Sequence, residues 1–422
     1  MLALALAPSR AAAESLSRQM AEKQGYRLRG GRKAEHSLET VLGHLHLVCL
    51  EGEAAYRGGI LAWSESILPG LKPLTPRLLE AESSRELIQL LCRVEGFYAG
   101  LHATPEEVTL FRDHVGARPL SYLKQGEAFL AASSRHALPG APNPLKPGHI
   151  LTLGREPGVR RWYSPPRPGR VGDPSQALAE ELRRAVEAYL PRGVWVSFSG
   201  GLDSSLLAHL ALALGKSPKL VSVGVEGCLD LRWAREAADI LGVELLEVTV
   251  DRRLLSEVLE TLLRLLPEPT PMNLALSSLY YIASMRAGGY IALGQGADEL
   301  FGGYMKYERA LLEGGESEAI RLMREDLESL HLGLERDELS TALGGSQPIT
   351  PYLARPIYEF ASQLTLDWKL RRLDGAVERK HVLREAAELL GVPEKLARRP
   401  KKAAQYGSGL QRLVEAILKK RV

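Results

Sequence analysis

The sequence predicts an α/β protein in which a mainly β first part precedes a doubly wound parallel sheet. Three observations support this prediction. The segment Tyr163–Arg170 is rich in proline, short apolar alternations come before it, and helix-like runs alternate with strand-like runs after it. The chain has 422 residues, more than one core usually holds, so we expect two domains over 1–165 and 175–422.

The first domain is predicted to be mainly β with packed helices. The apolar run Met1–Ala7 has no basic residue before it and is short for a secretion signal, so it predicts a first strand. Val108–Phe111 and Ala128–Ala131 predict further strands, and Ser84–Cys92 predicts a helix.

In the second domain, segments with the apolar spacing of a helix alternate with short apolar segments typical of buried strands. We expect helices over 177–189, 204–214, 231–241, 253–266 and 274–286, and strands over 194–198, 220–225, 245–250 and 290–293. Beyond Asp298 the pattern is mainly helical to the end. Such alternation predicts a parallel sheet that binds a nucleotide at the carboxyl ends of its strands.

Composition narrows the function classes. Hydrophobic residues make up 45% and charged residues 25% of the chain, which is typical of a soluble globular protein. A net charge of +3 gives no argument for nucleic-acid binding, and no apolar stretch reaches membrane-spanning length. The chain has three cysteines, at Cys49, Cys92 and Cys228. They lie far apart without metal-ligand spacing, which favours a reducing cytoplasm.

The run Ser199–Ser205 reads Ser-Gly-Gly-Leu-Asp-Ser-Ser between a predicted buried strand and a predicted helix. Gly200 and Gly201 allow a turn with positive φ, and they let backbone N–H groups approach a ligand at a helix N-terminus. The hydroxyls suited to phosphate are those of Ser199, Ser204 and Ser205. Asp203 would repel phosphate, so its use is to hold Mg²⁺. The run predicts a pyrophosphate-binding loop that opens ATP between its α and β phosphates. It lacks the lysine of a γ-phosphate-transferring loop.

A second glycine-rich run, Gly294–Tyr304, follows another short buried strand and should lie beside the first loop. The two runs together resemble the synthetase domain of asparagine synthetase B and its relatives, including β-lactam synthetase. The resemblance implies an adenine-nucleotide α-hydrolase sheet and the activation of a carboxylate as an acyl-adenylate. It also implies a Mg²⁺ held jointly by Asp203 and Asp298. Gly294 and Val223 are the further candidate nucleotide contacts.

Near the C-terminus, Lys380–Arg384 reads Lys-His-Val-Leu-Arg and resembles the family's Lys-x-x-Leu-Arg segment. The resemblance implies that Lys380 contacts the phosphates and stabilises charge that develops only in the transition state. Arg384 is a second candidate catalytic residue on the same segment. Arg398–Gly409 resembles the family's closing segment, whose cations would neutralise released pyrophosphate. A nucleic-acid patch or a merely solubilising cluster would carry the same charges.

The first half has a separate resemblance. Leu110–Tyr122 resembles a segment of the family's glutaminase domain, and Pro147–Leu153 resembles the end of that domain, which implies an α+β sandwich. That glutaminase uses a cysteine at the second position as its nucleophile, whereas this chain has Leu2 there. The three cysteines read as small buried apolar residues. We therefore expect a glutaminase-like domain that does not hydrolyse glutamine, with free ammonia or an amine within the substrate as the nucleophile.

Two departures from the family's pattern affect which carboxylic acid is expected as the substrate. Gln295 stands where the family has a glutamate, and Ala354 stands where it has an aspartate. Gln295 remains a candidate catalytic residue that orients a group, but a neutral amide cannot accept a proton as a base. Ala354 removes a contact expected near the charged end of the substrate. The family makes the side chain of aspartate the expected acid.

Several alternatives stay open at this point. A cyclase similar to β-lactam synthetase would use one substrate that carries both acid and amine, and an amide ligase would act on another acid. A nucleotide-binding regulator with decayed activity is a third class, which Gln295 keeps open although Asp203, Asp298 and Lys380 favour an enzyme. We expect ATP and Mg²⁺ as cofactors, and an acid and ammonia as partners. We expect no nucleic acid or membrane, and a homodimer stays open.

Overall fold

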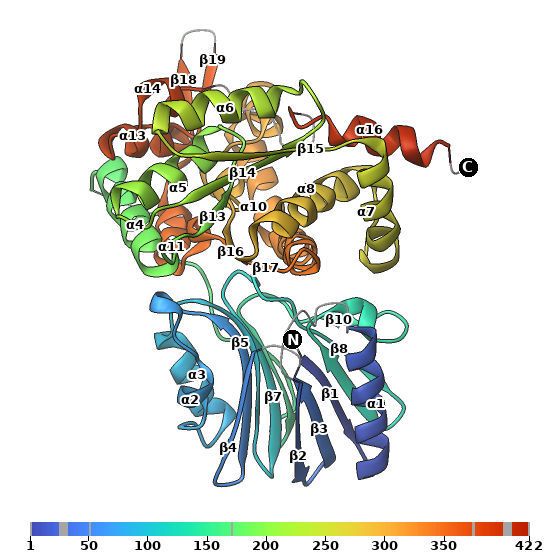
Figure 1. The fold of residues 1–422 in the computed structure, drawn as a ribbon. Helices are drawn as coiled ribbons and strands as arrows, with labels where there is room; N and C mark the ends of the chain where they lie inside the picture. The colour runs from blue at the N-terminus through green and yellow to red at the C-terminus, as the bar shows by residue number, and fades with distance from the viewer. Residues whose placement is uncertain are drawn as a thin grey trace. The chain divides into compact units, whose positions relative to one another are not determined.

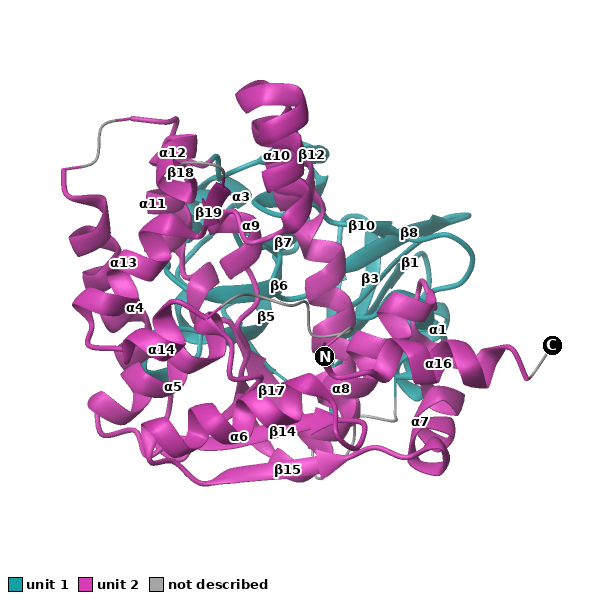
Figure 2. Ribbon diagram, turned by 90° about the horizontal axis from the view of Figure 1, so that it is seen from above, with its two compact units in different colours: residues 1–164 teal, residues 165–422 magenta. Residues whose placement is uncertain are grey.

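The computed structural model describes residues 2–24, 33–49, 52–169, 172–373, 376–399 and 407–420. The chain forms two compact units, Met1–Ser164 and Pro165–Val422 (Figure 2). Within the described ranges, no helix combines the length and the apolar character needed to cross a membrane.

Unit 1 is built on two antiparallel six-stranded sheets. The first has the order β10-β8-β9-β1-β3-β2, and the second has the order β12-β11-β7-β6-β5-β4. The strands are β1 (Leu2–Ala7), β2 (Ala34–Thr40), β3 (Gly43–Cys49), β4 (Glu53–Arg57), β5 (Ile60–Ile67), β6 (Phe97–Ala103), β7 (Glu107–Arg112), β8 (Ser121–Gln125), β9 (Ala128–Ala132), β10 (Asn143–Pro144), β11 (His149–Gly154) and β12 (Gly158–Arg161). The predicted α+β sandwich is confirmed.

The alternation in β1 explains how this sandwich is filled. Side chains of successive residues point to opposite faces of a strand. The leucines of the Leu-Ala repeat enter the core between the two sheets, where they join Trp63 and Leu101. The alanines face the other way and pack with Ala13 and Met20 of α1 (Arg10–Lys23). Small side chains on that face let the helix lie close to the sheet.

Helices cover the outer faces of the sandwich. Figure 1 shows α1 outside the first sheet, and α2 (Thr75–Leu78) with α3 (Ser84–Arg93) outside the second. Ser9 caps α1 by accepting a hydrogen bond from the N–H of Ala12, which fixes where that helix begins.

Unit 2 contains a five-stranded parallel sheet with the order β15-β14-β13-β16-β17. Its strands are β13 (Trp195–Ser197), β14 (Lys219–Gly224), β15 (Leu245–Thr249), β16 (Gly289–Ala292) and β17 (Ser346–Ile349). The helices that precede or connect them are α4 (Pro174–Tyr189), α5 (Leu202–Ala213), α6 (Leu229–Leu241), α7 (Arg252–Leu265), α8 (Pro271–Ala287), α9 (Ala297–Phe301) and α10 (Met305–Leu343). The predicted doubly wound sheet is confirmed.

The strand order creates one switch point, between β13 and β16. The chain first winds outward through α5, β14, α6 and β15, and then α7 and α8 return it to the other side of β13. Loops that leave neighbouring strands in opposite directions open a crevice at their carboxyl ends. The two glycine-rich runs of the sequence are these loops.

The C-terminal part carries short elements. They are η4 (Pro351–Leu353), α11 (Arg355–Gln363), α12 (Leu366–Lys369), the hairpin β18 (Leu370–Leu373) with β19 (Ala376–Arg379), α13 (His381–Leu389), α14 (Glu394–Ala397) and α16 (Leu410–Leu418). Strand β17 and the hairpin interrupt a region that was expected to be helical. Strand β17 contains Pro348, which an edge strand tolerates because one side needs no ladder hydrogen bonds.

Candidate active site

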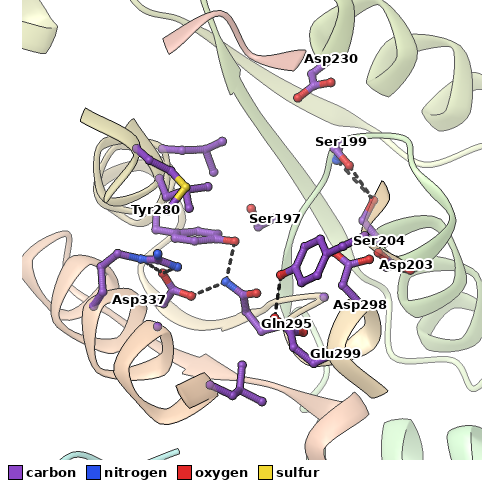
Figure 3. Close-up of a pocket in the computed structure, with 18 of the residues that line it drawn as sticks. Ser197, Ser199, Asp203, Ser204, Asp230, Tyr280, Gln295, Asp298, Glu299 and Asp337 are labelled. Carbon is purple, nitrogen blue, oxygen red and sulfur yellow. Dashed lines mark hydrogen bonds and ion pairs between the residues drawn. The ribbon is translucent and has the colours of Figure 1, made fainter. Parts of the chain in front are cut away.

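A cavity of about 680 Å³ opens at the carboxyl ends of β13, β14 and β16. Residues of both glycine-rich loops line it, together with side chains from α8 and α10. Figure 3 shows Ser199, Asp203 and Asp298 on one side of this space, and Tyr280 and Asp337 on the other.

The first loop has the geometry of an anion cradle. Gly200 has φ of +68°, and Gly201 caps the N-terminus of α5, so the dipole of that helix points at the loop. The N–H of Gly201 lies 3.4 Å from Ser199 Oγ, and the N–H of Ser199 donates to Ser204 Oγ at 3.3 Å. Ser205 Oγ is buried without a hydrogen-bond partner. Ser199 and Ser204 line the cavity with hydroxyls that suit phosphate oxygens, whereas Ser205 is fully buried outside the lining.

The second loop lies directly against the first, as expected. A Cβ atom on Gly294 would stand 3.1 Å from Cβ of Asp203, so glycine at 294 allows this close approach. Gly296 has φ of +88° and begins α9, which presents Asp298 in its first turn.

Lys380 joins the two loops. Its Nζ lies 2.5 Å from Oδ1 of Asp203 and 2.7 Å from Oδ1 of Asp298. The lysine side chain is buried, and burial lowers the pKa of its ammonium group while Asp203 opposes the shift. Gly303 packs so tightly here that a Cβ atom would stand 1.8 Å from Asp298 Oδ1. Two carboxylates that converge on one cation also form an oxygen-donor set that suits Mg²⁺.

The opposite side of the cavity holds a polar group that the sequence did not reveal. Gln295 Nε2 donates to the hydroxyl of Tyr280 at 3.1 Å and to the carboxylate of Asp337. Asp337 also accepts from Arg336 at 2.7 Å. The Asp337 side chain is buried, and burial raises its pKa although the Arg336 guanidinium lies beside it. No motif marks Tyr280 or Asp337, because both lie within helices at long spacing from Gln295.

Two further acidic side chains line the cavity between these groups. Glu299 accepts from Tyr304 at 2.6 Å, and burial raises the pKa of its carboxyl group. Asp326 pairs with Lys306 at 2.6 Å. Several carboxylates therefore line the cavity. The cations in its lining, Lys306 and Arg336, each pair with one of these carboxylates.

The other candidate residues have different surroundings. Val223 lines the cavity from β14, while Ala354 is buried at the start of α11. Arg384 was expected to act in catalysis, but its guanidinium donates to the carbonyl oxygens of Arg379, Ala397 and Arg399. Those contacts give it a structural use in the C-terminal part.

The closing segment is only partly within the described residues, since Pro400–Tyr406 lie outside them. Arg398 pairs with Glu378 and Glu388 near the surface. Arg399 turns inward and donates to the carbonyl oxygen of Gly200. Both arginines therefore have partners within the protein, rather than forming a free cluster for pyrophosphate.

The family comparison agrees with this geometry. The model of the family described as asparagine synthase matches residues 177–344 and 312–422, which together exceed half of the chain. The chain belongs to the asparagine synthase family. Members of this family are ATP-dependent, amide-forming ligases that release AMP and pyrophosphate.

The chain spans a different share of each relative in the family. A protein of Methanocaldococcus jannaschii named as a glutamine-hydrolyzing asparagine synthetase is 31% identical over 373 residues, which covers 74% of this chain and 69% of that protein. A glutamine-hydrolyzing asparagine synthetase of Oryza sativa subsp. japonica is 29% identical over 266 residues, with 57% of this chain and 44% of that protein covered. The chain thus spans less than half of the plant relative.

Solved structures give weaker likenesses. The allosteric regulatory enzyme of purine biosynthesis has a TM-score of 0.32 at 14% identity and covers 59% of this chain and 80% of its own. The nicotinamide mononucleotide (NMN) synthetase of Francisella tularensis has a TM-score of 0.30 at 16% identity, with 59% and 86% covered. Both scores are below 0.5, so they add nothing to the fold described above.

In this member of the family, the position expected to hold a nucleophile in unit 1 is part of the core. Leu2 is fully buried, and its N–H donates to Ser133 Oγ at 2.8 Å. The expectation of three buried cysteines holds for Cys49 alone, because Cys92 is exposed and Cys228 is half-buried. Cys49 lies directly opposite Leu2 in the pairing of β1 with β3. Burial raises the pKa of the Cys49 thiol to about 12, so it stays protonated and unreactive at neutral pH.

Arg112 and Asp113, which lie in the segment that resembles the family's glutaminase domain, also make structural contacts. Arg112 donates to the carbonyl oxygens of Gly116, Arg118 and Leu145. Asp113 accepts from the backbone N–H groups of Tyr98 and Gly116 at 3.0 and 2.6 Å. These bonds hold the turn after β7 rather than a ligand.

Proposed function

We propose that the protein activates the side-chain carboxylate of aspartate with ATP and transfers the acyl group to free ammonia, yielding asparagine, AMP and pyrophosphate. The observation that carries this proposal is the convergence of Asp203 and Asp298 on the buried Lys380, where two glycine-rich loops meet. Aspartate is the acid because the relatives are named asparagine synthetases. Reduced cysteines favour the cytoplasm as the site of the reaction.

The residues around the first loop would bind the nucleotide. ATP would offer its α-phosphorus to the acid, and a bound Mg²⁺ would supply charge neutralisation for the pyrophosphate. Asp203 and Asp298 would hold the metal ion, and the loop hydroxyls would bind pyrophosphate oxygens. A carboxylate oxygen of the acid forms a bond to the α-phosphorus, and the bond to the β-phosphate oxygen breaks. Lys380 stabilises the negative charge that develops in this step.

The second step needs a proton acceptor, because an amine that attacks a carbonyl carbon loses a proton. The ammonia nitrogen bonds to the acyl carbon, and AMP leaves with the electron pair of the broken C–O bond. Gln295 is neutral and serves to orient the amine. Asp337, hydrogen-bonded to Gln295, supplies the carboxylate that accepts the proton. Its raised pKa suits this role.

Free ammonia is the proposed nitrogen donor for a structural reason. The family's glutaminase reaction needs an accessible thiolate. In unit 1 the second residue is a buried leucine, and Cys49 beside it has a strongly raised pKa. Both features support a unit that does not hydrolyse glutamine.

We expect purified protein with Mg²⁺ and ATP to release pyrophosphate in the presence of aspartate, and to form asparagine when ammonium is added. Glutamine alone is expected to give no product above the background of contaminating ammonia. The panel should include other acids and an acid that carries its own amine. If no acid yields pyrophosphate, the enzyme proposal fails, and if glutamine supports the same rate as ammonium, the inactive glutaminase is wrong.

Replacing Asp337 with asparagine is expected to lower amide formation with ammonia about 10²-fold, because the proton acceptor is lost. Aspartate-dependent exchange between ATP and labelled pyrophosphate should persist, since that half-reaction needs no amine. Hydroxylamine is a weaker base than ammonia, so its adduct loses the proton to water more readily, and it should restore product as the hydroxamate. Glu328→Gln, at an exposed position on the same helix, is the control.

The lone Arg336 guanidinium left by Asp337→Asn can destabilise the protein. The double variant Arg336→Met with Asp337→Asn removes both charges and should show the same selective loss. Equal loss of exchange and amide formation in the double variant would contradict the assigned role.

A further inference from the structure

A buried guanidinium contacts the backbone of the first loop and is not among the residues that line the cavity. Arg399 Nη1 donates to the carbonyl oxygen of Gly200 at 2.9 Å and to that of Trp233 at 3.0 Å. Nη2 pairs with Glu236 at 2.6 Å, and the guanidinium carbon lies 5.2 Å from the centre of the Trp233 ring. The side chain is 6% exposed. One arginine therefore ties the loop to helix α6.

The contact with Gly200 sets the direction of a whole peptide unit. The described part of the chain has no cis peptide bond, so the C=O of Gly200 and the N–H of Gly201 point in opposite directions. Holding the oxygen toward Arg399 turns the N–H toward Ser199 Oγ, and Ser199 lines the cavity. A charged donor on the oxygen also polarises the same peptide and makes its N–H a stronger donor.

The backbone that places Arg399 is itself held by the C-terminal segment. Arg384 donates to the carbonyl oxygen of Arg399 at 3.4 Å and to that of Ala397 at 2.6 Å. The chain of contacts runs from Arg384 through Arg399 to Gly200. It joins α13 and α14 to a loop that lies about 200 positions earlier in the sequence.

We propose that Arg399 is a positioning residue for pyrophosphate: it fixes the Gly200–Gly201 peptide so that its N–H holds Ser199 Oγ, and Ser199 lines the cavity where the phosphates would bind. This inference rests on the proposed binding of ATP at the first loop. Arg399 would not touch the nucleotide in this arrangement, since it does not line the cavity. Its effect is on the affinity of the loop for phosphate, more than on the chemical step.

The neighbouring arginine gives a matched comparison. Arg398 precedes Arg399 directly and also pairs with glutamates, but it is more exposed and its partners are Glu378 and Glu388. Glu236 offers the second comparison, because its removal leaves both carbonyl contacts of Arg399 in place. A role limited to ion pairing would make Glu236 as important as Arg399.

The test measures binding of magnesium pyrophosphate and magnesium ATP by isothermal titration calorimetry, alongside KM for ATP and kcat. A lysine carries a single ammonium and cannot reproduce the fork that reaches both carbonyls. Arg399→Lys should therefore raise the Kd of pyrophosphate and the KM of ATP about tenfold, with a smaller change in kcat. Arg398→Lys and Glu236→Gln should each change these values by less than about twofold.

The outcomes separate the two proposals. If the unmodified protein binds neither ligand, the proposed nucleotide site is wrong. If it binds both, and a folded Arg399→Lys protein binds them as tightly as Arg398→Lys does, the positioning role is overturned. Arg399→Gln, which keeps one amide donor for a carbonyl, provides a second variant if the lysine protein does not fold. It should also weaken pyrophosphate binding, and unchanged affinity in it would equally overturn the role.

Discussion

Replacing Lys380 with methionine is expected to lower the rate of acid-dependent pyrophosphate release about 10³-fold. Lys380 is the cation that both Asp203 and Asp298 contact. In the proposed reaction its charge stabilises the negative charge that develops on the leaving pyrophosphate. Methionine has a similar length and fills the buried space without a charge. Pyrophosphate release at saturating ATP and aspartate measures the loss.

The same variant should change how stability depends on the metal. Without Lys380, two carboxylates face each other with no cation, so Lys380→Met should lose about 3 kcal/mol of unfolding free energy in metal-free buffer. Added Mg²⁺ should recover much of that loss by binding between them. Lys395→Met is the control, because Lys395 also pairs with a carboxylate, Glu236, but is largely exposed. More than a tenth of the original rate in Lys380→Met would contradict its assigned role.

Local sequence patterns were sufficient for most of the fold. The Leu-Ala repeat in β1 gives a strand with one large and one small face, and the structure uses both faces. In unit 2 each predicted strand and helix lies within a few residues of its observed position, because apolar periodicity there matches the burial of each element. Strand β17 was missed because four residues with Pro348 carry no strand signal without the neighbouring β16.

The residues of the candidate site likewise include some that the sequence predicted and some that it did not. Motifs marked Asp203 and Asp298, and resemblance marked Lys380, because each lies within a short recognisable run of residues. Asp337 and Tyr280 had no such signal, since helix packing rather than sequence spacing brings them to Gln295. Nothing in the motif of Arg384 indicated its carbonyl partners, which come from residues up to 15 positions away. Buried partners of this kind follow from tertiary structure alone.

Replacing Gly200 with alanine is expected to abolish detectable binding of magnesium ATP and to destabilise the protein by about 3 kcal/mol. Two costs add. At φ of +68° an L-residue is strained by about 1 kcal/mol. A Cβ atom would also stand 2.4 Å from the carbonyl oxygen of Trp233, which is backbone of α6 and cannot rotate away. The loop must shift, and the hydrogen bond from Arg399 to the Gly200 carbonyl is broken with it.

Gly193→Ala separates these two costs. Gly193 has φ of +70° in the turn before β13, but a Cβ atom there would meet nothing within 4 Å. Alanine at 193 should therefore cost only the strain of about 1 kcal/mol and leave the KM for ATP unchanged. Urea unfolding and ATP titration of both variants give the comparison. Equal losses in the two proteins would mean that backbone strain alone, and not the contact of the loop with α6, sets the requirement for glycine at 200.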